Sequence, residues 1–294
     1  MKVLDQSMGE NYAMYHADCI EGIKGLPDDS IDFSIYSPPF ISLYVYSNSD
    51  RDLGNSKNDK EFYHHFSFLS GELYRVIKPG RLMAVHCQDV PMMKERDGEI
   101  GLKDFPGQLI RMFEKVGFIY HSRITIWKDP VVEVTRTKAL GLLHKQLKKD
   151  SAMCRVGLPE YLVVMRKPGQ NKNPITHTDK EIPVPLWQQW ASPVWMDINP
   201  SNTLQKESAR EEADEKHICP LGLDIIERAL VLWSNPGDVV LSPFAGIGSE
   251  GYQAVKMGRR FIGFELKESY YRQAVLNLQI AEQMRFQRTL FTVN

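Results

Sequence analysis

Two short segments carry residue types that could bind and transform a small ligand. The first is the glycine segment 246–251, with the sequence Gly-Ile-Gly-Ser-Glu-Gly and the spacing GxGxxG, and it follows the apolar run 239–241. Glycines let the backbone approach a nucleotide-like ligand, and the next apolar run ends at Glu265, an acid that can bind ribose hydroxyls. The spacing alone also occurs in ordinary strand-to-helix turns, but Glu265 favours a nucleotide site.

The second segment is Ser37-Pro38-Pro39-Phe40, which follows the apolar run 31–36 directly. Two prolines fix φ and donate no hydrogen bonds, so carbonyls near them tend to stay free. A free carbonyl and a hydroxyl can accept hydrogen bonds from an exocyclic amino group, and Phe40 can stack on the ring that carries this group. A rigid Pro-Pro turn without chemistry is the alternative for such a segment taken alone.

The order of the two segments argues against a nicotinamide dinucleotide as the ligand. A dinucleotide fold needs a second mononucleotide half after the acidic residue. Only 29 residues follow Glu265, and most of them read as one helix. The other strands of the sheet must therefore come from upstream, which is a permuted order.

The elements that position these segments alternate as in a mostly parallel α/β sheet. Between turn residues, apolar runs predict strands at 31–36, 82–86, 118–127, 161–165, 239–241 and 261–264, and helical spacing covers 62–77, 105–116, 221–232 and 269–284. Residues 129–215 lack this alternation and hold three of the five tryptophans, at 187, 190 and 195. We expect an inserted lobe there, which commonly carries specificity.

Composition excludes several classes of protein. The 294 residues are 43% hydrophobic and 25% charged, which is typical of a globular chain and not of a disordered, collagen-like or disulfide-stapled one. No apolar run is long enough to span a membrane, and the first residues lack the apolar stretch of a signal peptide. The four cysteines are 65 to 68 residues apart without a CxxC, so we expect no metal site and a reduced, cytoplasmic location.

The formal net charge of -1 gives no global indication of a nucleic-acid partner, but the charge is unevenly distributed. Residues 123–173 hold eleven basic and four acidic side chains, a net +7, so the remainder carries −8. Clustered Lys and Arg are what phosphate contact requires, and a solvated basic helix is the alternative. The candidate DNA-binding residues are Arg136, Lys138, Lys145, Lys148 and Lys149.

With these motifs in order, the chain resembles the S-adenosylmethionine-dependent DNA amino-methyltransferases, in the permuted beta group of the N4-cytosine/N6-adenine family. Their (Asp/Asn/Ser)-Pro-Pro-(Tyr/Phe) motif matches residues 37–40, and their Phe-x-Gly-x-Gly loop matches 244–248. Further matching segments are 16–19 with 26–28, 72–80, 125–128, 217–228, 258–265 and 270–271. The resemblance covers most of residues 12–128 and 216–280.

The resemblance implies a Rossmann-like methyltransferase fold with a seven-stranded sheet and an inserted target-recognition lobe. It implies a catalytic half over 1–128, a recognition region over 129–215 with part of the sheet near 160–166, and a cofactor half over 216–294. The catalytic residues it implies are Ser37, Pro38, Pro39 and Phe40, with Phe40 and Trp127 stacking on the target base; a tryptophan in the core is the alternative for Trp127. The cofactor-binding residues it implies are Asp18, His217, Ser242, Phe244, Ala245, Gly246, Gly248 and Glu265. Two departures affect the cofactor site: Ser242 replaces the family's usual Asp, and residues 217–222 lack its usual basic residue.

The implied activity is methyl transfer from S-adenosylmethionine to the amino group of a base flipped out of double-stranded DNA. Ser37 at the first motif position favours cytosine N4, with adenine N6 as the alternative. A nicotinamide oxidoreductase and a catalytically dead DNA-binding regulator are more distant alternatives. The resemblance also implies a bacterial or phage-infected host cell, a possible homodimer and a possible cognate restriction endonuclease.

Overall fold

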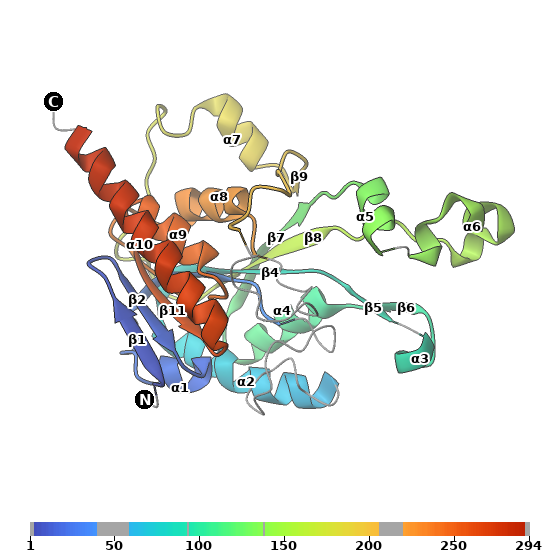
Figure 1. Cartoon of the computed structure of the whole chain (residues 1–294), viewed down its shortest axis with the longest axis horizontal. Coiled ribbons are helices and arrows are strands. Elements are labelled where there is room, and N and C mark those ends of the chain that lie inside the picture. Colours follow the sequence, from blue (N-terminus) through green and yellow to red (C-terminus); the bar gives the residue numbers. More distant parts are fainter. Residues whose placement is uncertain (1–2, 40–58, 93, 138, 206–219, 292–294) are drawn as a thin grey trace.

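A computed structural model describes residues 3–39, 59–92, 94–137, 139–205 and 220–291 of the chain (Figure 1). Three expected site residues, Phe40, Lys138 and His217, lie outside the described residues, and Arg136 is described only in its backbone.

The centre of the molecule is one nine-stranded sheet with the order β1-β2-β11-β10-β3-β4-β8-β7-β9. All six predicted strands are present, and most neighbouring pairs are parallel, so the α/β prediction is confirmed. The predicted number of seven strands is wrong, because short edge strands extend both sides: β1 pairs antiparallel with β2, and β9 pairs with β7. The strands are β1 (Asp5–Met8), β2 (Tyr12–His16), β3 (Ile31–Tyr36), β4 (Ile77–Cys87), β7 (Ile119–Ile126), β8 (Glu160–Arg166), β9 (Val194–Trp195), β10 (Val239–Ser242) and β11 (Arg260–Glu265).

Two strands from the last quarter of the chain lie in the middle of the sheet. Strand β10 pairs parallel with β3, with Leu241 beside Ser34, and β11 pairs parallel with β2, with Glu265 beside His16. Parallel neighbours end at the same edge of a sheet. The segments that follow β3, β10 and β11 therefore meet there, although some 200 residues separate the first from the others.

Helices cover both faces of the sheet (Figure 1). They are α1 (Cys19–Ile23), α2 (Asp59–Val76), α4 (Phe105–Lys115), α8 (Leu223–Trp233), α9 (Ser249–Lys256) and α10 (Glu268–Phe291). The four helices predicted by periodicity are α2, α4, α8 and α10, with ends shifted by a few residues.

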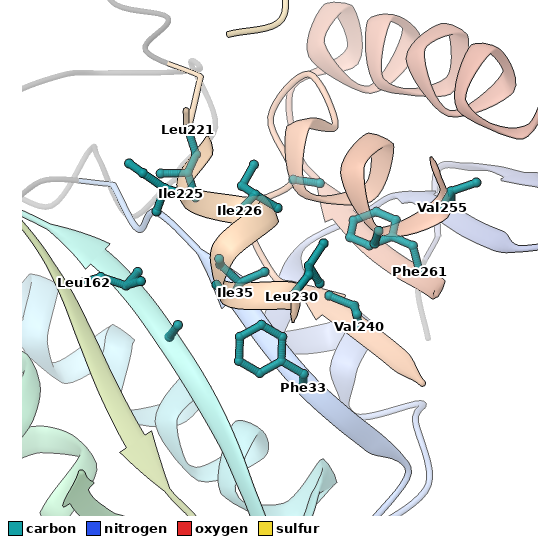
Figure 2. Close-up of a cluster of buried hydrophobic side chains, with 14 of the residues drawn as sticks. Phe33, Ile35, Leu162, Leu221, Ile225, Ile226, Leu230, Val240, Val255 and Phe261 are labelled. Carbon is teal, nitrogen blue, oxygen red and sulfur yellow. The ribbon is translucent and has the colours of Figure 1, made fainter. Parts of the chain in front are cut away.

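Alternation along the strands divides the buried side chains between two cores. On β8, Leu162 and Val164 face one core, and Val163 and Met165 face the other. In the first core, Phe33 and Ile35 of β3 pack with the apolar stripe of α8, which Figure 2 shows as Ile225, Ile226 and Leu230. The second core lies under α2 and α4 and is rich in phenylalanine: Phe62, Phe66, Phe105 and Phe113.

The region 129–205 contributes both to the sheet and to an arm outside it. Strands β8 and β9 belong to the main sheet, so more of this region is part of the sheet than its weak alternation of apolar and polar residues predicts. The helices α5 (Pro130–Thr137) and α6 (His144–Lys149) project away from the sheet beyond β7 and β8, and α7 (Val184–Trp190) lies near α8 and β9 (Figure 1). A hairpin of β5 (Val90–Met92) and β6 (Gly101–Lys103), with α3 (Lys94–Asp97) between its strands, projects on the same side as α5 and α6 (Figure 1).

A buried ion-pair network joins the amino ends of the central strands. Arg81 of β4 is 2% exposed, binds Asp238 before β10, and donates from Nε to the carbonyl of Asp32 on β3 at 2.8 Å. The Asp32 carboxylate accepts from Lys78 Nζ at 2.6 Å and from the backbone N–H of Val239 at 2.9 Å. This edge of the sheet is therefore held together by mutually satisfied charges.

Over the ranges described, the helices include none whose length and apolar character would allow it to cross a membrane. In the same part of the chain, Cys19, Cys87 and Cys154 are free thiols.

Candidate active site

A cavity of about 1460 Å³ lies at the carboxyl edge of the sheet. The segments that follow β3, β4, β7, β10 and β11 all contribute to its wall. Among the residues expected from the sequence, those lining it are Asp18, Ser37, Pro38, Pro39, Trp127, Phe244, Ala245, Gly246 and Glu265. The fold therefore brings the Ser-Pro-Pro segment and the glycine segment to the same cavity.

The glycine turn takes backbone conformations that other residues rarely adopt. Gly246 has φ of 52° and Gly248, the N-cap of α9, has φ of 84°. A Cβ atom on Gly248 would also lie 3.1 Å from Ala274 of α10, so this glycine allows α10 to pack against the turn. Gly246 lines the cavity, and apart from its own chain neighbours no atom of the described residues lies within 4 Å of the position its Cβ would occupy. A ligand can therefore approach the backbone at Gly246.

Glu265 supports the glycine turn and also faces the cavity. Its Oε2 accepts from the backbone N–H of Gly246 at 2.9 Å, and its Oε1 accepts from that of Lys267 at 2.8 Å. A carboxylate can accept about four hydrogen bonds, so it retains capacity for ligand hydroxyls. This geometry suits the role expected for Glu265 at a ribose.

Asp18 lines the cavity from within the first βα connection. Its Oδ1 accepts from the backbone N–H of Glu21 at 3.0 Å and caps α1. Asp18 therefore both caps a helix and lines the cavity.

Buried polar atoms without a partner lie beside the glycine turn. Among the described residues, Ser242 Oγ and Ser249 Oγ are buried and find no hydrogen-bond partner, and Ser249 lines the cavity. Buried polar atoms are almost always hydrogen-bonded, so the Ser249 hydroxyl fits a site that a polar ligand completes. Ser242, by contrast, is not among the residues that line the cavity.

Glu250 is a cavity residue that sequence reasoning did not select. It is 3% exposed, and burial together with the charge of Glu265 raises the pKa of its carboxyl to about 8. The sequence shows that Glu250 lies inside the glycine motif, but only the packing of α9 shows that its side chain is buried at the cavity wall.

Ser37, directly after β3, is held by the end of β4. Its Oγ lies 3.2 Å from His86 Nδ1 and 3.3 Å from the backbone carbonyl oxygen of His86, and its single proton can be donated to either atom. Pro38 and Pro39 follow it along the cavity wall. A hydroxyl and the backbone of a proline pair therefore face the space in which a ligand would bind.

A line of polar side chains continues from Ser37 along the strand ends, and sequence reasoning did not find it. His86 Nε2 lies 3.0 Å from Glu160 Oε2, and Lys128 Nζ binds the other oxygen of Glu160. Burial alone would raise the pKa of the Glu160 carboxyl, but His86 and Lys128 outweigh burial and hold that pKa well below its usual range. The three residues lie on different strands or their ends, so no sequence spacing connects them.

Aromatic side chains form part of the same wall. Trp127, at the end of β7, is 45% exposed and lines the cavity, so the alternative of a core tryptophan is wrong. Phe244 lines the cavity as well, and its ring centroid lies 5.8 Å from that of the buried Tyr36. Both rings are placed where a planar ligand could contact them.

The basic stretch 123–173 does not form a single charged face. Ion pairs join Arg155 to Glu133, Lys128 to Glu160, and Lys167 to Asp29. The partner of Lys167 belongs to the turn before β3, at the amino edge of the sheet and away from the cavity. Glu133 and Glu160 belong to the stretch and are already counted in its net charge, whereas the pairing of Lys167 with Asp29 lowers the free positive charge of the stretch by one. Helix α6 exposes three lysines: Lys145, Lys148 and Lys149. Gln146 of the same helix lines the cavity.

The fold places a glycine turn, the acid that follows it and a Ser-Pro-Pro segment at one cavity of an α/β sheet, an arrangement typical of nucleotide-binding enzymes. A DNA methylase family model, of the N6/N4 type, matches residues 31–276. The chain belongs to this family of DNA methylases.

Known relatives and solved structures agree with this assignment. The chain is 23% identical over 284 residues to the DNA adenine methyltransferase YhdJ of Escherichia coli K12, covering 92% of this chain and 84% of that one. Its fold matches a putative DNA modification methylase of Thermus thermophilus, complexed with S-adenosyl-L-methionine, with a TM-score of 0.68, 21% identity and coverage of 92% and 96%. It matches the cytosine-N4-specific PvuII DNA methyltransferase with a TM-score of 0.67, 18% identity and coverage of 97% and 96%.

Proposed function

We propose that this DNA methylase transfers the methyl group of S-adenosylmethionine to cytosine N4 in a base flipped out of double-stranded DNA. The observation that supports this most directly is the shared cavity: Ser37 lines the same space as Gly246 and Glu265. One side can hold a nucleoside-bearing methyl donor, and the other can hold an amino group.

The cofactor half consists of the segments after β10 and β11. Glu265 would bind the ribose hydroxyls, the backbone at Gly246 would lie against the cofactor, and Asp18 would face the adenine. The unpartnered Ser249 hydroxyl and the Glu250 carboxyl add polar atoms at the same turn. S-adenosylmethionine supplies an electrophilic methyl group on a sulfonium centre.

The acceptor half is the Ser37-Pro38-Pro39 segment. A base amino nitrogen is a poor nucleophile because its lone pair is delocalised into the ring. Hydrogen bonds from its two hydrogens to Ser37 Oγ and the Pro38 carbonyl would favour a pyramidal nitrogen and direct the lone pair at the methyl group. Since methyl transfer is an in-line displacement, such positioning supplies much of the rate.

Aromatic groups complete the base pocket. Trp127 would contact one face of the flipped base, and Phe40, outside the described residues, would stack on the other. A base inside a duplex is out of reach, so the enzyme must extrude it. The exposure of Trp127 at the cavity supports this placement.

The choice of cytosine N4 rests on Ser37 at the first position of the motif, and adenine N6 is the second candidate. Relatives of both kinds exist, since YhdJ is an adenine enzyme and the PvuII enzyme is cytosine-N4-specific. The lysines of α6 would contact phosphates beside the cavity, within a target-recognition region over residues 129–215.

Analysis of the modified nucleosides tests this proposal. The protein is incubated with S-adenosylmethionine and DNA from cells that lack DNA methylation, and the nucleosides are then separated and identified by mass spectrometry. We expect N4-methylcytosine. N6-methyladenine alone would overturn the base assignment, and no methylated nucleoside would overturn the activity.

A further inference from the structure

The side chains behind Ser37 form an ordered path for a proton. Ser37 Oγ contacts His86 Nδ1, His86 Nε2 contacts Glu160, and Glu160 binds Lys128. His86 and Glu160 are largely buried, and all four residues line the cavity. Their order is hydroxyl, imidazole, carboxylate and ammonium.

The hydrogen bonds determine which nitrogen of His86 carries a proton. A carboxylate can only accept, so His86 Nε2 must donate to Glu160 across their 3.0 Å separation. In the neutral imidazole, Nδ1 is then the acceptor and faces Ser37 Oγ at 3.2 Å. His86 and then Lys128 hold the pKa of this carboxyl well below its usual range against the effect of burial, so Glu160 stays ionised.

We propose that Ser37, His86 and Glu160 act as a proton relay that accepts the proton released by the target amino group during methyl transfer. His86 and Glu160 act through Ser37 and touch no substrate, so they are positioning and proton-accepting residues behind the catalytic one. This inference rests on the proposed methyl transfer and adds to it a route for the proton.

The proton balance closes within these residues. The nitrogen lone pair forms the new N–C bond while the S–C bond breaks and its electron pair stays on sulfur, which becomes a neutral thioether. The nitrogen is left with a positive charge and a surplus proton. That proton moves to Ser37 Oγ as the hydroxyl proton of Ser37 moves to His86 Nδ1. The imidazolium that results is paired with the Glu160 carboxylate until its proton passes to solvent.

The contacts of Ser37 suit both the start and the end of this transfer. Before transfer, its hydroxyl can donate to the unprotonated Nδ1 of His86. Afterwards, Nδ1–H donates to Ser37 Oγ, and the hydroxyl can turn to the backbone carbonyl of His86, which lies 3.3 Å away. The hydroxyl therefore has an acceptor in each state without any movement of the backbone.

Replacing His86 by Asn separates a relay from a purely structural contact. Asn can accept the Ser37 hydrogen bond but cannot take up a proton. We expect H86N to lower the single-turnover rate of methyl transfer about 10²-fold, the usual scale for general-base catalysis. The dissociation constant of S-adenosylmethionine and the Tm should stay close to those of the unmodified protein, and E160Q should cause a smaller loss of rate.

The pH dependence of the same rate gives a second readout. Among the described residues, Glu160 on β8 contacts His86 and Lys128 after β7 contacts Glu160, while Asp18, the N-cap of α1, lines the same cavity. We expect the pH profile of the rate to differ between the unmodified protein and H86N, because only the unmodified protein has an imidazole at this position that can take up a proton.

A matched control and a variant-free measurement complete the test. H121N makes the same change at an exposed histidine on β7 and should retain the rate and its pH dependence. If H86N matches H121N, the relay is wrong, whereas a protein that methylates no DNA in any form would overturn the proposed function itself. Should H86N fail to fold, the nitrogen chemical shifts of His86 in the unmodified protein decide the matter: a proton on Nε2 at high pH supports the relay, and a proton on Nδ1 overturns it.

Discussion

The two edges of the central sheet use polar side chains in opposite ways. At the amino edge, Arg81 binds Asp238 and the carbonyls of Asp32 and Asn173, so its donors are used within the protein. At the carboxyl edge, Ser249 Oγ is buried without a partner among the described residues, and the Glu250 carboxyl is held buried beside the charge of Glu265.

This difference follows from what each edge must do. A closed network of charges stabilises the arrangement of strands but leaves no group for a ligand, because its donors and acceptors are already occupied. The cavity edge keeps acceptors and hydroxyls unsatisfied, which costs stability in the free protein and supplies hydrogen bonds to a bound ligand. The predictions below test this contrast.

The largest effect is expected at the amino edge. Replacing Arg81 by Met leaves the carboxylate of Asp238 buried without its partner, and breaking a buried pair in this way costs about 3–5 kcal/mol. Urea unfolding measures the loss. As a control, K24M breaks an exposed pair with Glu21 and should leave the free energy of unfolding nearly unchanged. Equal losses in both variants would refute the structural role of the Arg81 network.

At the carboxyl edge, Ser37→Ala should change activity and leave stability nearly unchanged. Removing one hydrogen-bonding group that is aligned with the transition state typically lowers the rate about 10²–10³-fold. The single-turnover rate of methyl transfer checks this, with the Tm and cofactor affinity measured on the same sample. Unchanged transfer in this variant would show that the acceptor pocket is assigned wrongly.

Glu265→Ala should weaken binding of S-adenosylmethionine by about 1.5–3 kcal/mol, the value of hydrogen bonds to a charged group. Isothermal titration calorimetry measures this loss. Glu268→Ala is the matched control, because Glu268 lies three residues further along the chain and pairs with Arg272 on an exposed part of α10. Equal affinity in the two variants would remove Glu265 from the cofactor site.

Glu250 makes stability depend on pH. Its pKa is raised to about 8 in the folded protein, while an unfolded chain has the ordinary value near 4.3. Between these values the unfolded state releases a proton that the folded state keeps, so this contribution to stability is lost as pH rises from about 4 to 8. Glu250→Gln removes the effect, and we expect its Tm without cofactor to exceed that of the unmodified protein by roughly 3 °C at pH 9.

At pH 5 the Tm difference between these two proteins should shrink, because the carboxyl is then protonated in the folded protein and partly protonated in the unfolded chain. A Tm difference that is equal at pH 5 and pH 9 would show that Glu250 is ionised in the folded protein, and it would contradict the pKa that burial implies.

The smallest effect is expected at the rim of the cavity. Replacing Lys148 and Lys149 by Ala should weaken binding to any DNA sequence by a similar factor and reduce the slope of log affinity against log salt by about 2. Fluorescence anisotropy over a salt series measures the slope. Lys115→Ala, at the exposed end of α4, should leave it unchanged. Loss of affinity without a change in slope would place these two lysines away from phosphates.

The sequence alone predicted the six main strands, four helices and the two chemical segments, because these depend on local properties. The strand β3 was predicted with its observed bounds from an apolar run that ends at Tyr36, directly before Ser37. Three strands of the main sheet were missed: β1 and the two-residue β9 at its edges, which carry too few residues for a pattern, and β2, a five-residue strand inside the sheet. The division of the chain at residues 128 and 215 stays a prediction, as do the roles of the catalytic, cofactor-binding and DNA-binding residues.

Residue types and their order along the chain determined that this protein has a glycine turn with an acid after it and a separate acceptor motif before it. Those properties are local, since proline and glycine act on their own backbone. Only the tertiary structure decided that Ser37 contacts His86 and that His86 in turn contacts Glu160, which binds Lys128. These contacts form only after strands β3, β4 and β8 have paired. It also decided which charges are free: Lys167 belongs to the basic stretch in sequence, but in the folded chain it is paired with Asp29.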